Sequence, residues 1–381
     1  MKGSSFVRRA RLLSLPLLVV APLALAGCTG KPTETADAIK VTANDRSCTL
    51  SATTAATGNV TFEISNSGSK TNEFYLYAGG DRVIGEVENI GPGLTRRLVV
   101  DVPEAGNYTT ACKPGMTGDG IRGGFTVTGD SRKPADTDGK LAAATAGYQR
   151  YVASEADALL AKTGEFVAAV KAANVAEAKR LYPAARTHWE RIEPVAESFG
   201  DLDPLTDGRE DTLEPGQVLT GWHRLERDLW RDGLQPDSAA MADELLRNVQ
   251  EVVSRAKTVQ FTPVQLANGA KGLLDEVATG KVTGEEERYS HTDLWDFRAN
   301  VEGAEAAVAA LRPVVLDREP ALVPKLDARF AAVNQALTAL QAGDGYVLYN
   351  ALSPAQVKDL SEKVDALAEP LSTVAGVVSS R

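Results

Sequence analysis

The sequence predicts two domains of different fold class, an N-terminal β-sandwich followed by an all-α helical bundle. Its 381 residues exceed a single ordinary domain, and 43% of them are hydrophobic, enough for a sizeable core. Over residues 39–130, short β-branched and aromatic runs alternate with turn residues, whereas from residue 140 onward apolar residues recur at helical spacing. The change of period predicts a linker at residues 131–139 and a helical domain over residues 140–381.

The composition limits the chemistry available to the chain. Acidic residues outnumber basic residues by 51 to 41, which gives a net charge of −10 and argues against a nucleic-acid partner. Only three histidines and three cysteines occur in the whole chain. These counts exclude a metal site built from many histidines or many cysteines.

Residues 1–27 have the pattern of a secretory signal peptide. Four basic residues precede an apolar run that is too short to span a bilayer. The run ends in Leu25-Ala26-Gly27-Cys28, which resembles the bacterial lipobox, so we expect Cys28 to be lipidated and residues 28–38 to form a tether. Arg8-Arg9 leaves twin-arginine export open as an alternative route. The sequence therefore predicts an extracytoplasmic, membrane-anchored lipoprotein.

Residues 39–130 are predicted to form a sandwich of the cupredoxin or immunoglobulin type. Gly, Asn, Asp and Pro separate the strand-like runs about every 8–12 residues, as is typical of such sandwiches. The runs are Val41, Val60–Ile64, Phe74–Tyr77, Leu98–Val100 and Phe125–Val127.

From residue 140, six to eight helices with short connections predict an antiparallel bundle. A long first helix is expected to end near Asn174, and Pro183 is expected to kink or break the second. A polar loop is predicted at residues 200–216. The later helices are expected at residues 175–199, 217–233, 238–259, 263–279, 285–315, 320–342 and 354–379.

His223 and Glu226 are three residues apart on a predicted helix. This spacing puts both side chains on one face, about 5–6 Å apart at Cβ, where they can point at a common ion. A salt bridge along the helix is the alternative interpretation of an isolated pair.

The preceding helix and loop are rich in acids. Glu190, Glu193 and Glu197 share one face, where like charges destabilise a helix unless a partner offsets them. Arg186 and Arg191 supply some offset, so a solvated acidic face is the alternative. Five further carboxylates follow in residues 201–211, just before the chain returns toward the histidine. This concentration indicates a hard-cation site.

The expected ligands favour certain metals. Several carboxylates with one imidazole and no thiolate suit iron, manganese or zinc better than copper(I), and calcium would not need the histidine. Zinc-dependent peptide hydrolysis is disfavoured, since no His-Glu-x-x-His occurs and Arg227 stands where an inverted motif would need its second histidine. One acid from the segment Thr283–Asp296 is expected to reach the same site. Structural roles are favoured for His188 and His291.

Several strings in this region resemble the imelysin-like domain of the EfeO family, the extracytoplasmic iron-binding component of the EfeUOB iron-uptake system. The resemblance runs from about residue 140 to the C-terminus and implies a bundle of two four-helix halves. The strings that carry it are His188–Asp203, Gly221–Glu226, Asn268–Ala270, Leu274–Ala278 and Tyr289–Phe297.

The resemblance also implies the metal ligands. The family's His-x-x-Glu motif falls on His223 and Glu226. Its further ligands fall on Glu190, Glu193, Asp207 and Glu286. For two of these further ligands, Asp207 and Glu286, neighbouring acids offer alternative alignments. The implied cargo is Fe2+ or Fe3+, with zinc binding expected in vitro.

The N-terminal segment resembles the cupredoxin-like domain of the same family, through residues 44–48, 88–93 and 106–112. No histidine precedes residue 135, so a blue-copper centre is excluded. Two alternatives remain for Cys48 and Cys112. They form a disulfide in an oxidising compartment, or they bind copper or a second iron as thiolates. If the cysteines bind a metal, the additional ligands would be Glu73 and one of Glu86, Glu88 or Met116.

The resemblance implies that the protein binds iron and delivers it to a membrane iron permease, together with the haem-peroxidase-like partner of the EfeUOB system. Two alternatives stay open. One is metal-dependent binding of an acidic polysaccharide, as some relatives of this domain suggest, which basic residues along an interdomain cleft would favour. The other is a metallopeptidase, a label that the family carries by classification and that the motifs here do not support.

Overall fold

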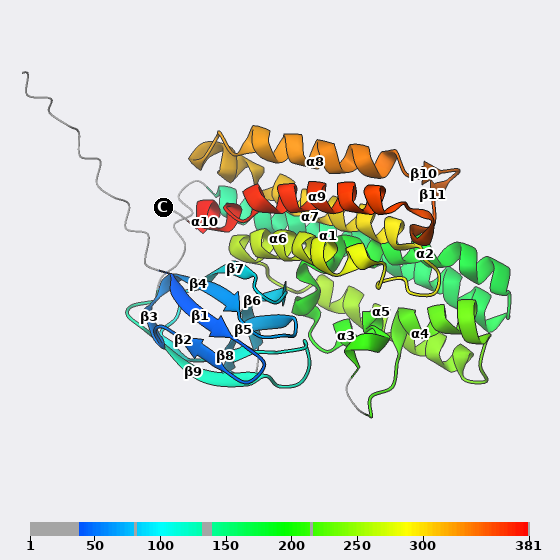
Figure 1. The fold of residues 1–381 in the computed structure, drawn as a ribbon, viewed down its shortest axis with the longest axis horizontal. Coiled ribbons are helices and arrows are strands. Elements are labelled where there is room, and N and C mark those ends of the chain that lie inside the picture. Colours follow the sequence, from blue (N-terminus) through cyan, green and yellow to red (C-terminus); the bar gives the residue numbers. More distant parts are fainter. Residues whose placement is uncertain (1–37, 80–81, 132–138, 214–215, 380–381) are drawn as a thin grey trace, which may run out of the picture. The chain divides into compact units, whose positions relative to one another are not determined.

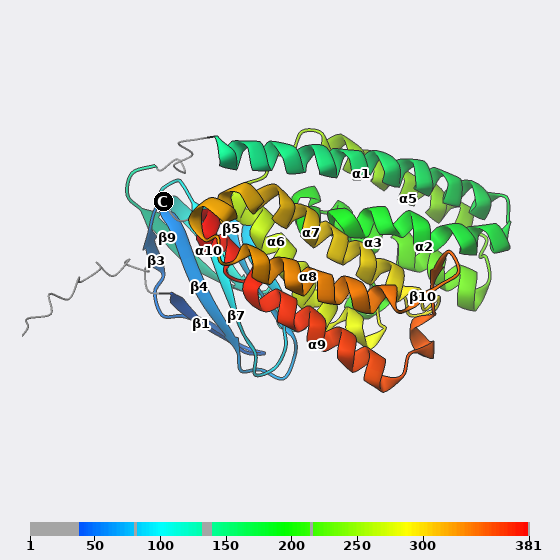
Figure 2. The same ribbon diagram turned by 90° about the horizontal axis from the view of Figure 1, so that it is seen from above.

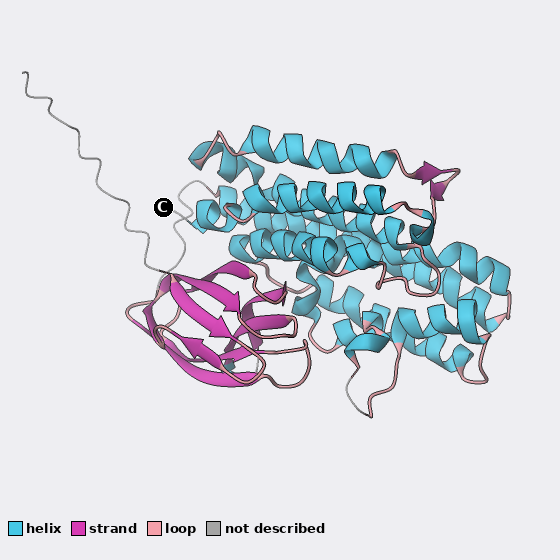
Figure 3. Ribbon diagram, viewed as in Figure 1, coloured by secondary structure: helices cyan, strands magenta, loops and turns pink. Residues whose placement is uncertain are grey.

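The fold is a β-rich region followed by a helical domain, as the sequence predicts (Figures 1 and 3). The computed structural model describes residues 38–79, 82–131, 139–213 and 216–379, all within one compact unit. The predicted signal peptide, Cys28, nearly all of the tether and most of the linker lie outside the described residues. No helix in the described part of the chain is long and apolar enough to cross a membrane.

The sandwich consists of two sheets. One has four strands in the order β2-β1-β4-β7, and the other has five in the order β3-β9-β8-β5-β6. The β1–β4 and β3–β9 pairs are parallel, and the remaining pairs are antiparallel. The strands are β1 (Ile39–Ala43), β2 (Cys48–Leu50), β3 (Thr54–Ala56), β4 (Gly58–Asn66), β5 (Asn72–Ala78), β6 (Arg82–Ile90), β7 (Thr95–Val102), β8 (Gly106–Cys112) and β9 (Ile121–Thr128).

The core of the sandwich follows from the alternation seen in the sequence. Val60, Phe62 and Ile64 are buried on one face of β4, as period-two patterning requires. Phe62 contacts Phe74 and Phe125 of the opposite sheet, with ring centroids 5.0 and 5.5 Å apart. The five predicted strand runs all lie on strands. Four further strands were missed because they are very short or interrupted by polar residues and glycine.

A disulfide joins the two sheets. Cys48 of β2 and Cys112 of β8 are covalently linked, across a sequence separation of 64 residues. Of the two alternatives for this pair, the structure therefore contains the disulfide, and neither sulfur is a thiolate ligand.

The helical domain is built from long helices that lie side by side. α1 packs against α2, α5 and α7, and α6 packs against α7, α9 and α10. Figure 2 shows α1 along one side, α9 along the other and α7 between them. The helices are α1 (Lys140–Lys171), α2 (Val175–Ile192), α3 (Leu202–Asp207), α4 (Gly221–Arg227), α5 (Ser238–Ala256), α6 (Pro263–Thr279), α7 (Asp293–Arg318), α8 (Val323–Thr338), α9 (Pro354–Leu371) and α10 (Val374–Ser379). A small hairpin, β10 (Gln341–Ala342) and β11 (Gly345–Tyr346), follows α8.

Several predicted helix boundaries were wrong. The helix predicted at 285–315 begins only at Asp293, since His291 has a φ of +59° that interrupts a right-handed helix. The helix predicted at 175–199 continues as a 3₁₀ helix from Glu193 to Phe199, where Pro194 lacks an amide hydrogen. Pro183 lies inside α2 without ending it. The loop predicted at 200–216 contains α3.

Polar contacts from α6 connect the helical domain to β7. Arg96 Nε lies 3.1 Å from Asp275 Oδ2, and Asn268 Nδ2 donates a hydrogen bond of 2.7 Å to the carbonyl oxygen of Val99. Both helical residues lie on α6, which therefore forms part of the boundary with the sandwich.

Replacing both cysteines of the disulfide by serine should destabilise the sandwich by about 4 kcal/mol, because the link closes a long loop in the unfolded chain. Hydrogen exchange at β4 and β5 amides measures this change, with amides of α1 as the internal control. Unchanged protection of the β4 and β5 amides would contradict a stabilising role for the link.

Candidate metal centre

The helix that carries His223 begins in tight contact with the segment that carries Asp207. α4 starts at Gly221, whose φ is +67°, a conformation that residues with a side chain rarely adopt. A Cβ atom at this position would lie 2.0 Å from the carbonyl oxygen of Thr206. Glycine therefore allows α4 to approach the end of α3 and brings the imidazole beside the carboxylate.

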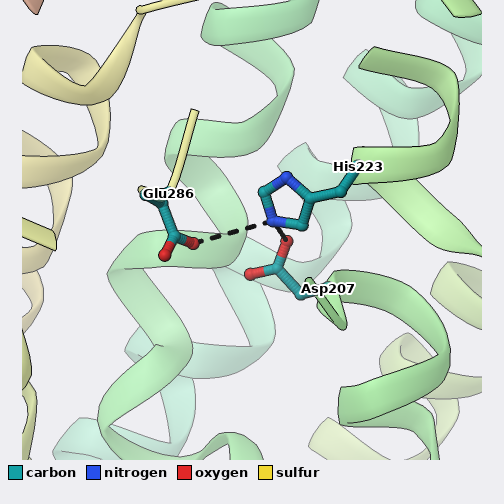
Figure 4. Close-up of side chains that lie close together, drawn as sticks. All are labelled: Asp207, His223 and Glu286. Atoms are coloured by element: carbon teal, nitrogen blue, oxygen red, sulfur yellow. Dashed lines mark ion pairs between the residues drawn. The ribbon is translucent and has the colours of Figure 1, made fainter. Parts of the chain in front are cut away.

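His223 lies between two carboxylates (Figure 4). Its Nε2 atom is 3.4 Å from Asp207 Oδ1 and 3.7 Å from Glu286 Oε1, and the three side chains are only 3–8% exposed. Nε2 makes no hydrogen bond to any described residue, and one ligand atom from each residue lies within 4.8 Å of the others. Imidazole nitrogen and carboxylate oxygens that converge in this way suit iron, manganese or zinc.

Glu226 faces the other nitrogen of the same imidazole. Its Oε2 atom lies 3.5 Å from His223 Nδ1. Its Oε1 atom accepts hydrogen bonds from the backbone N–H groups of Tyr289, at 2.9 Å, and Ser290, at 2.7 Å. A carboxylate held in this way orients the ring and determines which nitrogen is free to face a metal.

A second arrangement of ligands shares the same histidine. His223, Glu226 and Glu287 also offer ligand atoms within 4.8 Å of one another. Glu287 is fully buried, and it accepts a hydrogen bond of 2.8 Å from the hydroxyl of Ser290. Its other oxygen lies 2.5 Å from Arg186 Nε, so this carboxylate already has charged and polar partners.

His223 and the acids Asp207, Glu226 and Glu286 favour their charged forms despite burial, whereas burial raises the pKa of Glu287 well above its usual value. Burial and the charge of Arg186 favour the neutral imidazole, but the surrounding carboxylates outweigh both and raise the pKa of His223 well above its usual value. Burial also favours the neutral acids. Neighbouring cations nevertheless lower the pKa of Asp207 and Glu226, and lower that of Glu286 well below its usual value. A metal ion that binds this histidine would therefore compete with a proton for the imidazole.

Two of the six predicted ligands lie apart from the histidine. Lys281 Nζ lies 2.8 Å from Glu190 Oε2 and 2.9 Å from both carboxylate oxygens of Glu193. Asn300 Nδ2 donates to the same two acids, at 2.8 and 2.7 Å. The lysine is fully buried and its ammonium group pairs with both carboxylates, while burial and the neighbouring Glu190 raise the pKa of Glu193 well above its usual value.

Arg186 connects the two groups of acids. This side chain is fully buried and forms close ion pairs with Glu190 and Asp207. Its Nη2 atom also lies 3.2 Å from Glu286 Oε1. The structure therefore brings all six predicted ligands into one charged network, but only three of them, Asp207, Glu226 and Glu286, lie around His223.

Sequence reasoning missed Lys281, Glu287 and Asn300. The i,i+4 spacing of Arg186 and Glu190 was a visible signal for that ion pair. Glu287 was visible only as a neighbour of Glu286. Lys281 and Asn300 carry no comparable signal, because they reach the network from segments distant in sequence.

The acids predicted for a second metal site lie on β5 and β6. The hydroxyl of Tyr75 is within hydrogen-bonding distance of Glu73 Oε2, at 3.1 Å, and of Glu88 Oε1, at 2.9 Å. Glu86 lines the same cleft as these two acids. Because the cysteines form a disulfide, a metal in this domain would depend on such acids, and this site stays a prediction.

A cleft of about 450 Å³ separates these acids from the helical domain. Asp207 and Glu286 form part of its wall, so the candidate metal centre borders the cleft through two of its carboxylates. The ionisable residues that line it are eight acids, Glu73, Glu86, Glu88, Glu193, Asp203, Asp207, Glu276 and Glu286, and two bases, Lys113 and Arg209.

The other two histidines make contacts elsewhere. His188 Nδ1 lies 2.7 Å from Glu155 Oε2. The backbone carbonyl of His291 accepts a hydrogen bond from the amide of Tyr349 at 2.9 Å. These contacts agree with the structural roles expected for both.

Comparison with known proteins matches both domains. Residues 144–374 match the Imelysin family, and residues 17–127 match the Cupredoxin-like domain. The iron uptake system component EfeO of Yersinia pseudotuberculosis serotype I (strain IP32953) is 38% identical over 344 residues, covering 89% of this chain and 91% of that protein. EfeO of Escherichia coli O157:H7 is 37% identical over 346 residues, with the same coverage of each chain. EfeO of Yersinia pestis is 36% identical over 375 residues, covering 97% of this chain and 96% of that protein.

The fold and the histidine–carboxylate centre define an imelysin protein with an N-terminal cupredoxin-like domain. The sequence identity to the EfeO relatives, and the share of each chain that the match covers, assign the protein to one family within this class. The chain belongs to the EfeO family of iron uptake system components.

Replacing Lys281 by methionine should lower the free energy of unfolding of the helical domain by about 3–5 kcal/mol, because it leaves Glu190 and Glu193 buried without their ammonium partner. Denaturant unfolding of the metal-free protein measures the change. The matched control is Lys358→Met, which removes an exposed partner of Glu362 and should change little. Equal stability of the Lys281 variant and the unmodified protein would contradict the importance of this buried charge.

Proposed function

We propose that this protein binds iron, as Fe2+ or Fe3+, at Asp207, His223 and Glu286. The main support is the position of His223 Nε2, which is buried and without a hydrogen bond to described residues, between two carboxylates. Carboxylate oxygens and one imidazole suit iron among the common biological metals. Glu226, predicted as a ligand, is placed to orient the histidine through Nδ1.

In this proposal the protein holds iron outside the cytoplasm and delivers it to a membrane iron permease, with a haem-peroxidase-like partner. The named relatives are iron uptake system components, which supports a place in such a system. Anchoring through a lipidated Cys28 remains part of the proposal. The role is transport rather than catalysis, because the sequence lacks the histidine pair of zinc peptidases.

The polysaccharide alternative receives no support from the cleft. That function would be favoured by basic residues along the cleft, to attract the carboxylates of the sugar. Acids outnumber bases by eight to two among the charged residues that line it, so a polyanion would meet charge repulsion whereas a cation would be attracted.

The variant His223→Ala should weaken iron binding by more than about tenfold, because it removes the only imidazole of the centre. Anaerobic calorimetry with Fe2+ measures the affinity. His188→Ala is the matched control, since that histidine pairs with Glu155 away from the centre. Unchanged affinity in the His223 variant, with its helical circular dichroism preserved, would contradict the site assignment.

Binding of Fe2+ should release about one proton, because the surrounding carboxylates raise the pKa of His223 and so favour the protonated imidazole in the metal-free protein. Affinity should therefore fall as the pH is lowered and rise with pH until the histidine is deprotonated. Calorimetry in two buffers with different ionisation enthalpies counts the protons. A heat of binding that is independent of the buffer would show that no proton leaves.

A further inference from the structure

Three cations pair with the acids in and around the candidate metal centre, and they differ in how deeply they are buried. The side chains of Arg186, on α2, and Lys281, in the 3₁₀ turn Lys281–Thr283, have no exposed surface. Arg209 comes from the short segment after α3, and its side chain is 12% exposed. Of the three cations, Arg209 is therefore the least enclosed by its neighbours.

Arg209 lies at the edge of the candidate metal centre and lines two cavities beside it. Its Nη1 atom donates to Glu286 Oε2 at 2.9 Å and to Glu276 Oε1 at 3.4 Å. Besides the large cleft, a small pocket borders His223 and Glu226. Arg209 and Glu286 are the two described residues that line both. An ion that approaches Glu286 from either opening must therefore come close to the guanidinium group.

Arg209 also has acidic neighbours outside the centre. Its Nε atom lies 3.6 Å from Asp211 Oδ1, and its Nη2 atom lies 3.8 Å from Glu285 Oε1. These acids are 35% and 31% exposed, so they lie on the solvent side of the guanidinium. An Arg209 side chain that moved toward them would leave Glu286 and still keep charged partners, which would avoid the cost of an unpaired buried charge.

We propose that Arg209 is an exchangeable counter-ion of the metal centre. In the metal-free protein its guanidinium neutralises Glu286. When a cation enters, the guanidinium withdraws to Asp211 and Glu285, and it returns as the cation leaves. An arginine keeps its charge at every physiological pH, so it competes with the metal for the same carboxylate. Arg209 is thus a positioning residue that controls uptake and release without being a ligand, and this role rests on the proposed iron binding.

The variant Arg209→Gln tests this role, since it keeps a polar side chain but removes the competing charge. It should bind Fe2+ about tenfold more tightly and release it more slowly, as expected when a like charge is removed from beside a bound cation. Anaerobic calorimetry gives the affinity, and stopped-flow transfer to a chelator gives the release rate. The matched control is Arg231→Gln, which removes an exposed arginine that pairs with Asp232 and should change little.

A second variant should change the affinity for Fe2+ in the opposite direction. Asp211→Asn combined with Glu285→Gln removes the two acids that receive the guanidinium, so Fe2+ should bind more weakly. In the background of Arg209→Gln the same pair of changes should have almost no effect, a coupling that independent sites would not show. Both acids are partly exposed, so this variant should fold even if Arg209→Gln does not.

The outcomes separate this role from the proposed function. If the unmodified protein binds no Fe2+, iron binding itself is wrong. If the unmodified protein binds Fe2+ but folded Arg209→Gln binds it equally or more weakly, the counter-ion role is wrong. Additive effects of the arginine and acid substitutions would also overturn it.

Discussion

The surplus of carboxylates inside the helical domain is the constraint on which much of its structure depends. A buried carboxylate is tolerated only when a cation or a hydrogen-bond donor accompanies it. Arg186 and Lys281 provide those charges from α2 and from the turn after α6, and Asn300 adds donors from α7. These elements therefore meet at one place, so the same contacts set the packing of the bundle and the geometry of its candidate metal centre.

The network divides its acids into two groups with different properties. Glu190 and Glu193 are neutralised by a lysine with no exposed surface, so an internal cation already occupies their position. Glu193, Asp207 and Glu286 all border the cleft, but only Asp207 and Glu286 lie beside His223, whose pKa the surrounding carboxylates raise. In the role proposed for this centre, both the proton on His223 and the Arg209 counter-ion are exchangeable. A site of this kind can take up a cation and later release it, as an uptake component must.

The sandwich contributes a second acidic surface. Its acids on β5 and β6 line the same cleft as the centre, and such a concentration of one charge raises the local concentration of cations. The disulfide between the two sheets and the contacts of α6 with β7 hold this surface in place. The acids of the cleft therefore come from both domains, whereas the acids around His223 belong to the helical domain alone.

Local sequence patterns by themselves determined the two domains and part of the candidate site. The change from period two to period 3.6 predicted both domains, and the spacing of His223 and Glu226 placed them on one helical face. Only the tertiary structure decided which acids surround the histidine. Lys281 and Asn300 lie 91 and 110 residues from Glu190, and the left-handed backbone at His291 moves the start of α7 past Glu286. Pairing between such distant side chains depends on how helices pack, which no local period encodes.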